Sequence, residues 1–375
     1  MNTDLTIKQQ KNEYELDNYD FCGYVISNWH LNVCYSLLLK LQSEKSNKLK
    51  GILLIDSEHK RITNDMLVYL ENINIVYYFC DKNTLITDLK KIKFFNFWHN
   101  KFEKPLYFIS PLEYKLFWFN FIILNKKRNI QIYKIDEGTG SYCPRTIFDK
   151  INLNDRLEII KGKTKSIFKI LCIFILKIKG IKFNSYFIYT KKIKRLKVND
   201  INLKYLRKIY KIKKSEFHNN FKQNQILILK EGDVNILSKQ ESLLFYIKLI
   251  KIISKQSNLS IYIKRHPNDT DKSLKTKIEQ TFTNVNVIDT KEGIEDLYSS
   301  LSPKYIFAGH STATFSLHYI YDVPVYDYSL IYKDLITKKT PLTKAFIKEL
   351  KLNYQFFKND KNIHFLKKIE DIKLL

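Results

Sequence analysis

The stretch QILILKEGDVNILSKQESLLFYIKLIKIISKQSNLSIYIKRHP, residues 225 to 267, decides the fold of this chain. An apolar run at residues 225–230 predicts a buried strand, and a second run at residues 260–264 predicts another. Residues 235–256, which lie between them, form a long helical pattern. A strand, a helix and a strand in this order form a unit of parallel sheet, so the stretch predicts an α/β protein.

The same alternation extends over both halves of the chain. Further strands are predicted at residues 22–27, 51–56, 73–79, 105–110, 130–135, 285–289, 304–309 and 323–327. Helical patterns lie between them, at residues 31–45, 64–71, 83–95, 112–124, 271–281, 294–301 and 311–321. We therefore expect two Rossmann-like, doubly wound domains that face a central cleft, which is the GT-B layout. Several two-domain sugar enzymes share this layout, so the fold alone leaves the function open.

Changes in composition indicate where the domains divide. Residues 1–160 are expected to form an N-terminal Rossmann-like domain, and residues 225–340 a C-terminal, nucleotide-binding one. Residues 161–224 are expected to be a basic helical insertion or linker, and residues 341–375 a C-terminal helical segment. The run SEFHNNFKQN at residues 215–224 is the best boundary, because it is polar and lacks periodicity.

The chain is strongly basic. Among its 375 residues, 64 Lys and Arg outnumber 38 Asp and Glu, which gives a formal net charge of +26. Such a surface attracts polyanions, including nucleic acid, anionic lipid, nucleotides and acidic glycans. Nucleic-acid binding is an alternative that rests on charge alone, and without a recognisable module we expect no nucleic-acid partner. We also expect a cytoplasmic protein, since the first twenty residues hold no signal-peptide core and no apolar stretch is long enough to span a bilayer.

A basic stretch at residues 161–197 combines lysines with apolar residues. As a helix it would present a broad apolar face with lysines at its flanks, a pattern typical of docking on anionic lipid. Two interpretations stay open. The stretch could hold the protein at the anionic inner face of the cytoplasmic membrane, or it could be a buried helix with a lysine-rich solvent face.

Three short motifs fall at the predicted carboxyl ends of strands, where an open α/β sheet binds its ligands. The first is KIDEG, residues 134–138, which pairs the carboxylates Asp136 and Glu137 with a glycine that lets the chain turn. One carboxylate can accept the proton of an attacking hydroxyl while the other hydrogen-bonds the loop. The sequence leaves open which does which, and a solvated acidic turn is the plain alternative.

The other two motifs suit a phosphate. KRHP ends in Pro267, which favours an extended His266 whose imidazole can donate to a departing phosphate oxygen. AGHST places Ser311 and Thr312 at the start of a helix, where hydroxyls and free N–H groups can cradle a phosphate. The plain alternatives are a surface histidine in a basic loop and ordinary helix capping. Glu295, in GIEDL, can bind ribose hydroxyls or be a helix-surface acid.

Taken together, the motifs resemble those of the bacterial GT-B sialyltransferases and polysialyltransferases. That group is marked, in this order, by a D/E-D/E-G motif, an HP motif and a Ser-Ser or Ser-Thr motif. Here they read Asp136-Glu137-Gly138, His266-Pro267 and Ser311-Thr312. The resemblance runs from about Cys22 to Asp327 and includes the opening strand and turn, YVISNWHLN. In the family this strand lies near the acceptor cleft, so the resemblance implies that residues 1–160 form the acceptor side. His310 departs from the pattern, and the basic stretch has no counterpart.

The resemblance implies an inverting transfer of sialic acid from CMP-sialic acid to a hydroxyl of a glycan, either a lipooligosaccharide or a capsular polysaccharide. It implies no cofactor and no required metal ion, because CMP leaves with a single phosphate and needs no Asp-x-Asp pair to hold a cation on a diphosphate. A GT-B transferase that uses another nucleotide sugar is the alternative. An assay with different donors separates the two.

The resemblance also assigns roles to residues. By position, Glu137 matches the general base, with Asp136 as the alternative. His266 matches the residue that contacts the CMP phosphate and assists its departure. Glu295 matches the ribose binder, and the two hydroxyls match the phosphate binders. The positions assigned to donor binding are Gly138, Pro267, Glu295, Ser311 and Thr312.

Overall fold

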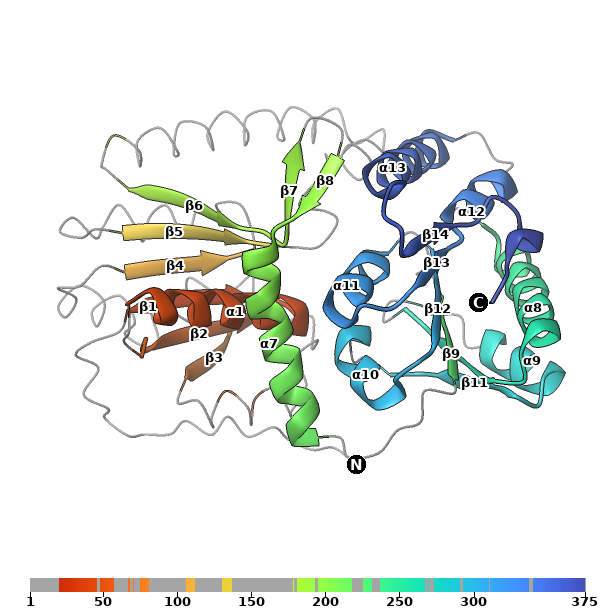
Figure 1. The fold of residues 1–375 in the computed structure, drawn as a ribbon, viewed down its shortest axis with the longest axis horizontal. Coiled ribbons are helices and arrows are strands. Elements are labelled where there is room, and N and C mark those ends of the chain that lie inside the picture. The colour runs from red at the N-terminus through yellow and green to blue at the C-terminus, as the bar shows by residue number, and fades with distance from the viewer. Residues whose placement is uncertain are drawn as a thin grey trace.

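Two six-stranded sheets organise the molecule (Figure 1). They are seen in a computed structural model, which describes residues 20–45, 48–56, 67, 70, 75–80, 106–111, 130–136, 178, 181–192, 195–217, 225–230, 237–266, 269, 273–290, 293–309, 311–336 and 340–374. Within each sheet, every neighbouring pair of strands is parallel.

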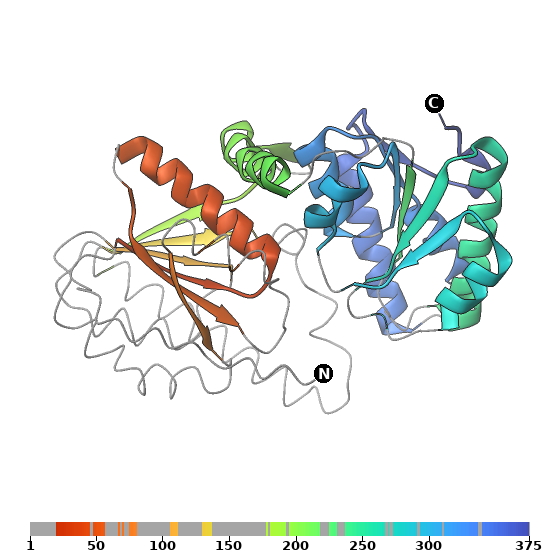
Figure 2. The same ribbon diagram turned by 90° about the horizontal axis from the view of Figure 1, so that it is seen from below.

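The N-terminal sheet has the order β3-β2-β1-β4-β5-β6. Its strands are β1 (Phe21–Val25), β2 (Gly51–Asp56), β3 (Val76–Cys80), β4 (Leu106–Ser110), β5 (Ile130–Ile135) and β6 (Lys182–Tyr186). All five strands predicted in this half are present. Helix α1 (Asn28–Lys45) follows β1 and lies across one face of the sheet (Figure 2).

The C-terminal sheet repeats this order, as β11-β10-β9-β12-β13-β14. Its strands are β9 (Gln225–Leu229), β10 (Ser260–Lys264), β11 (Val285–Ile288), β12 (Tyr305–Ala308), β13 (Val325–Asp327) and β14 (Ile363–Phe365). Its helices are α8 (Lys239–Gln256), α9 (Ser273–Thr281), α10 (Ile294–Leu301), α11 (Thr312–Tyr321), α12 (Ser329–Leu335) and α13 (Pro341–Phe357), followed by the short 3-10 helix η2 (Ile369–Asp371). In sequence terms both sheets have the order 3-2-1-4-5-6, which is that of the Rossmann fold. The prediction of two Rossmann-like domains of GT-B type is confirmed, and the central cleft stays a prediction.

Helix α8 shows how the sequence sets these elements. It begins later than predicted because Ser238 caps it: the Ser238 hydroxyl accepts from the Glu241 N–H at 3.2 Å, and the Glu241 carboxylate accepts from the Ser238 N–H at 2.8 Å. Its apolar face then packs on the buried strands β9 and β10 in one core.

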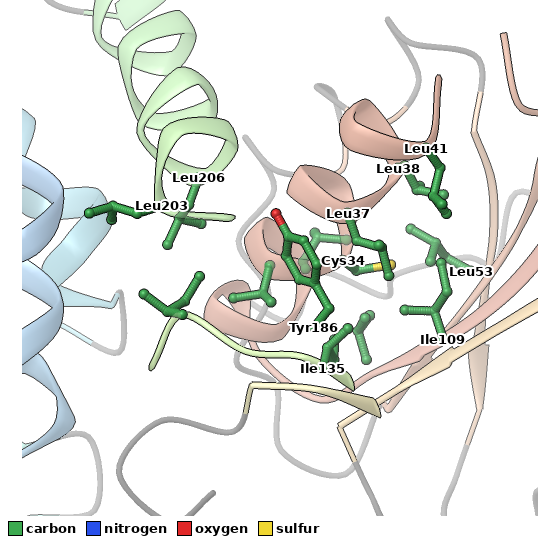
Figure 3. Close-up of a cluster of buried hydrophobic side chains, with 14 of the residues drawn as sticks. Cys34, Leu37, Leu38, Leu41, Leu53, Ile109, Ile135, Tyr186, Leu203 and Leu206 are labelled. Carbon is green, nitrogen blue, oxygen red and sulfur yellow. The ribbon is translucent and has the colours of Figure 1, made fainter. Parts of the chain in front are cut away.

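The N-terminal core lies between α1, the sheet and helix α7 (Asp200–Phe217). Figure 3 shows these side chains converging from the three elements. Those labelled are Cys34, Leu37, Leu38, Leu41, Leu53, Ile109, Ile135, Tyr186, Leu203 and Leu206.

Residues 161–224 were expected to be helical, and this expectation is wrong for part of the segment. The described part contains β6, the antiparallel hairpin β7 (Tyr189–Lys192) and β8 (Arg195–Val198), and α7. Strand β6 completes the N-terminal sheet by pairing with β5. Likewise, residues 341–375 hold the strand β14 as well as the helix α13. Of the four strands that were not predicted, β7 and β8 form this separate hairpin. The other two, β6 and β14, lie at a sheet edge, where backbone pairing on one side suffices without a continuous apolar run. The domain boundaries themselves stay a prediction.

Helix α7 connects the two halves. It lies between the two sheets in Figures 1 and 2 and packs on α1 through buried residues such as Leu206. On its other side, the Arg207 Nε donates to the backbone oxygen of Tyr319 in α11 at 2.7 Å. The segment expected to be a linker therefore contributes to the packing of both halves.

Candidate functional site

The HP and Ser-Thr motifs lie at the same edge of the C-terminal sheet. Strand β9 runs between β10 and β12, so that Leu229 is level with Lys264 on one side and Ala308 on the other. His266 follows β10, and Ser311 follows β12. The two motifs therefore flank the end of β9, where the strand order reverses. In open α/β sheets this switch point is where ligands bind.

His266 is exposed at the end of β10. Its backbone oxygen accepts a hydrogen bond from the N–H of Asp269 at 2.8 Å, which ties together residues three positions apart. Pro267, the second residue of the motif, lies outside the described residues. Exposure leaves the imidazole accessible to a ligand at this edge.

The neighbours of His266 are buried and charged. The Asp269 carboxylate is fully buried and lies 2.7 Å from the Lys230 Nζ and 3.2 Å from the Arg265 Nε. Arg265 also donates to the backbone oxygen of Asp269 at 2.7 Å and to the Asp289 carboxylate at 3.2 Å. The Lys264 Nζ donates to the backbone oxygens of Arg265 and Thr290, at 2.9 and 2.7 Å. Lys264 and Arg265, the two residues before His266, are therefore both engaged in contacts within the protein.

Ser311 caps helix α11. Its hydroxyl oxygen accepts from the N–H of Ala313 at 3.2 Å, and its own N–H donates to the backbone oxygen of Gly309 at 2.9 Å. Ordinary capping is therefore part of its role. A serine hydroxyl that accepts one bond can still donate its proton, so capping is compatible with binding an anion at the same helix end. Thr312 is the first residue of α11, and its side chain lies outside the described residues.

Glu295 lies in α10 and is bound to α11. Its Oε1 accepts from the Ser316 hydroxyl at 2.6 Å, and its backbone oxygen accepts from the Tyr321 hydroxyl at 2.6 Å. The ring of Tyr321 stacks on Tyr298 with centroids 3.9 Å apart, and burial raises the pKa of Tyr298 to about 12. Glu295 is thus half-buried and held in place, unlike an ordinary helix-surface acid. Its role toward a ribose stays a prediction.

Asp136 directly follows β5 in the other sheet. Its carboxylate is 0% exposed, and its Oδ2 accepts from the backbone N–H of Ile188, beyond β6, at 3.1 Å. This bond joins Asp136 to the segment after β6 and not to the loop of its own motif, so which of the two carboxylates is the base stays a prediction. Glu137 and Gly138 lie outside the described residues, so whether the pair approaches His266 stays a prediction.

One Asp-x-Asp triplet does occur in the chain, at residues 269–271. Its first carboxylate, that of Asp269, is occupied by Lys230 and Arg265. Asp271 lies outside the described residues. In the part of the chain that the structure describes, no group of three or more His, Cys, Asp or Glu side chains is arranged to hold a metal ion.

Two Rossmann-like halves with phosphate-type motifs at a switch point define a sugar enzyme of the GT-B fold class. Comparison with known families goes further: the model of the alpha-2,8-polysialyltransferase (POLYST) family matches residues 11–328, a range that includes all three motifs. The chain belongs to this family and is a sialyl-transferring glycosyltransferase. The resemblance drawn from the motifs is confirmed.

Solved structures of similar fold have low sequence identity to the chain. A sialyltransferase from Photobacterium damsela is 12% identical, with 92% of this chain and 81% of that one covered and a TM-score of 0.48. The E. coli heptosyltransferase WaaC is 9% identical, with 92% of each chain covered and a TM-score of 0.45. The UDP-GlcNAc 2-epimerase from Methanocaldococcus jannaschii is 11% identical, with 91% and 93% covered and a TM-score of 0.49. At these values the similarities carry no argument about function.

Among curated proteins, none matches the chain in sequence. No helix in the described part of the chain is both long and apolar enough to cross a membrane.

Proposed function

We propose that the protein transfers sialic acid from CMP-sialic acid to a hydroxyl of a glycan acceptor, with inversion at the anomeric carbon and without a metal ion. The observation that supports this most is the placement of the HP and Ser-Thr motifs on both sides of β9, at the switch point of the C-terminal sheet. An imidazole and a helix N-terminus at one edge suit a nucleotide monophosphate that gains charge as it departs.

In this proposal the C-terminal half assists the leaving group. The bond between the anomeric carbon and the phosphate oxygen breaks, and the electron pair stays with CMP. His266 donates to the departing phosphate, while Ser311, Thr312 and the first N–H groups of α11 stabilise its charge. Glu295 binds the ribose hydroxyls.

The N-terminal half supplies the base. As the acceptor oxygen bonds to the anomeric carbon, its proton passes to a carboxylate on the opposite face of the sugar. We assign this role to Glu137, because Asp136 is buried and bonded to the N–H of Ile188. A buried carboxylate occupied by the backbone is poorly placed to meet an acceptor.

The acceptor is proposed to be a glycan of a lipooligosaccharide or a capsular polysaccharide. The description of the family names an alpha-2,8 linkage. If this protein forms the same linkage, its acceptor is a glycan that already ends in sialic acid. The basic surface, with a net charge of +26, suits an anionic donor and an anionic product.

The test is to incubate the protein with CMP-sialic acid and a panel of terminal galactosides and sialosides. We expect release of CMP and a matching mass increase in one class of acceptor. Parallel reactions with UDP, GDP and ADP sugars are the control for the donor. Consumption of one of those donors in place of CMP-sialic acid would replace this proposal by a GT-B transferase of another specificity.

Turnover is expected to persist in excess EDTA. A single phosphate leaves, and the first acid of the Asp-x-Asp triplet is occupied by Lys230 and Arg265. If chelation abolishes turnover and Mg²⁺ restores it, the metal-free mechanism is wrong.

A further inference from the structure

A buried ionic network joins the ends of three adjacent strands beside His266. Its centre is Asp269, whose side chain is 0% exposed and which takes ion pairs from Lys230, just after β9, and Arg265, just after β10. Arg265 extends the network to Asp289, just after β11. The strands β9, β10 and β11 are neighbours in the sheet, so the network spans one side of the switch point.

The contacts of Arg265 fix the position of its guanidinium. Arg265 uses three nitrogens at once: Nε on the Asp269 carboxylate, Nη2 on the Asp269 backbone oxygen and Nη1 on the Asp289 carboxylate. A guanidinium that is held at three positions has little freedom to move, and lysine cannot reproduce the contact. Buried charges are also costly to desolvate, and apolar side chains would often stabilise a core as well. Stability alone therefore gives a weak reason for this arrangement.

In sequence, His266 lies between Arg265 and Asp269, which form an ion pair with each other. Arg265 precedes it directly and is almost fully buried, while Asp269 follows it and donates its N–H to the His266 backbone oxygen. Both sides of the His266 backbone are therefore anchored to the buried network, and His266 itself is exposed. An exposed residue on an anchored backbone can present its side chain at a fixed place.

We infer that Lys230, Arg265 and Asp269 act as a positioning clamp that fixes His266 for the departing phosphate. This inference rests on the proposed function, since it assumes the role of His266 there. The three residues are assigned no contact with donor or acceptor and act through His266. Misplacement of a catalytic group by about 1 Å can lower a rate by about a hundredfold, so a clamp of this kind affects turnover.

The variant Arg265→Lys tests the clamp, because it keeps the buried positive charge and loses the three-point contact. In the wild-type background we expect turnover of CMP-sialic acid to fall by about tenfold or more. In the His266→Ala background the same substitution should change turnover by less than about twofold, because its effect acts through the missing imidazole. The exposed pair Lys248–Glu370 provides the matched control: Glu370→Gln should leave turnover unchanged in both backgrounds.

If Arg265 had only a structural role, turnover and stability would change in a different way. Arg265→Lys would then lower thermal stability, and any loss of turnover would be equal in the two backgrounds. Equal losses, or no loss in the wild-type background, would overturn the clamp. Wild-type turnover is measured first: if the wild-type protein does not turn over CMP-sialic acid, the proposed function fails, and this result is distinct from failure of the clamp.

A second variant covers the case that Arg265→Lys does not fold. Asp289→Ala removes one contact of the guanidinium, and the Asp289 side chain is 55% exposed, so no buried charge is left unpaired. We expect a smaller loss of about threefold in the wild-type background and none beside His266→Ala. An equal effect in both backgrounds would again overturn the inference.

Discussion

The two sheets have the same strand order and differ in the residues at the carboxyl ends of their strands. After β5 of the N-terminal sheet come two carboxylates, and the buried one, Asp136, accepts a backbone N–H. At the carboxyl ends of β9 and β10 in the C-terminal sheet lie the buried cations Lys230, Lys264 and Arg265, with His266 exposed beside them. Topology makes the same kind of ligand edge twice, and the residues at the strand ends decide its chemistry. A carboxylate edge suits a hydroxyl that loses a proton, and a cationic edge suits an anionic leaving group.

The largest loss of turnover should come from substitutions after β5, at the carboxyl end of the N-terminal sheet. Glu137→Gln should lower turnover at least about a hundredfold while leaving CMP binding intact, because it removes only the proton acceptor. The matched variant is Asp136→Asn, whose side-chain oxygen can still accept from Ile188. It should keep turnover within about tenfold of wild type. The reverse ranking of the two variants would make Asp136 the base.

At the C-terminal edge, His266→Ala should weaken CMP binding and turnover together, with turnover reduced about tenfold or more. The imidazole is expected to contact the phosphate in the ground state as well as in the transition state. Calorimetry with CMP and with cytidine separates this contact from general damage, since cytidine lacks the phosphate. If CMP affinity does not change, His266 is only a loop residue.

Substitutions at the start of α11 are expected to have a smaller effect, which falls mainly on CMP binding. Ser311→Ala combined with Thr312→Val should weaken CMP binding relative to cytidine by about tenfold, since these residues are assigned to the phosphate. Loss of the Ser311 cap should also lower the free energy of unfolding by about 1 kcal/mol. Equal losses of affinity for CMP and cytidine would indicate that the pair acts through folding alone.

The smallest effect on turnover is expected outside both edges, in the basic stretch at residues 161–197. In this stretch, whose described part includes β6, β7 and β8, Ile178 is 70% exposed. The protein should co-sediment with anionic liposomes at low salt, less at high salt, and poorly with neutral ones. The variant replaces five lysines by glutamine: Lys163, Lys165, Lys169, Lys177 and Lys179.

This variant should sediment less than wild type and keep turnover on a soluble acceptor, because each basic residue near anionic lipid contributes about 1 kcal/mol to binding. If it sediments like wild type, the stretch is structural and the proposed docking at the inner membrane face is wrong.

Most of the fold could be predicted because buried parallel strands are continuous apolar runs. The strands β2, β5 and β10 have the predicted bounds. The two strands of the six-stranded sheets that were missed, β6 and β14, lie at the same edge position of their sheets. An edge strand is paired on one side only, so its sequence KFNSY or IHF carries a weak signal.

The candidate site could be predicted only in part. The motifs were readable because each comes directly after a strand, and parallel strands bring their carboxyl ends to one edge. Two contacts of the site could not be predicted from the sequence. The bond from the Ile188 N–H to Asp136 joins residues 52 positions apart, and the pairing of Asp269 with Lys230 joins residues 39 positions apart. Pairing over such distances leaves no periodic pattern in the sequence.

The most direct test of the central claim is one turnover of CMP-sialic acid, ¹³C-labelled at the anomeric carbon and followed by NMR with the best acceptor. We predict that the label passes to the acceptor with inverted anomeric configuration, that CMP is released in equal amount, and that Glu137→Gln blocks the step without preventing donor binding. Transfer with retained configuration, or transfer at the wild-type rate by Glu137→Gln, would contradict the division of labour between the two edges.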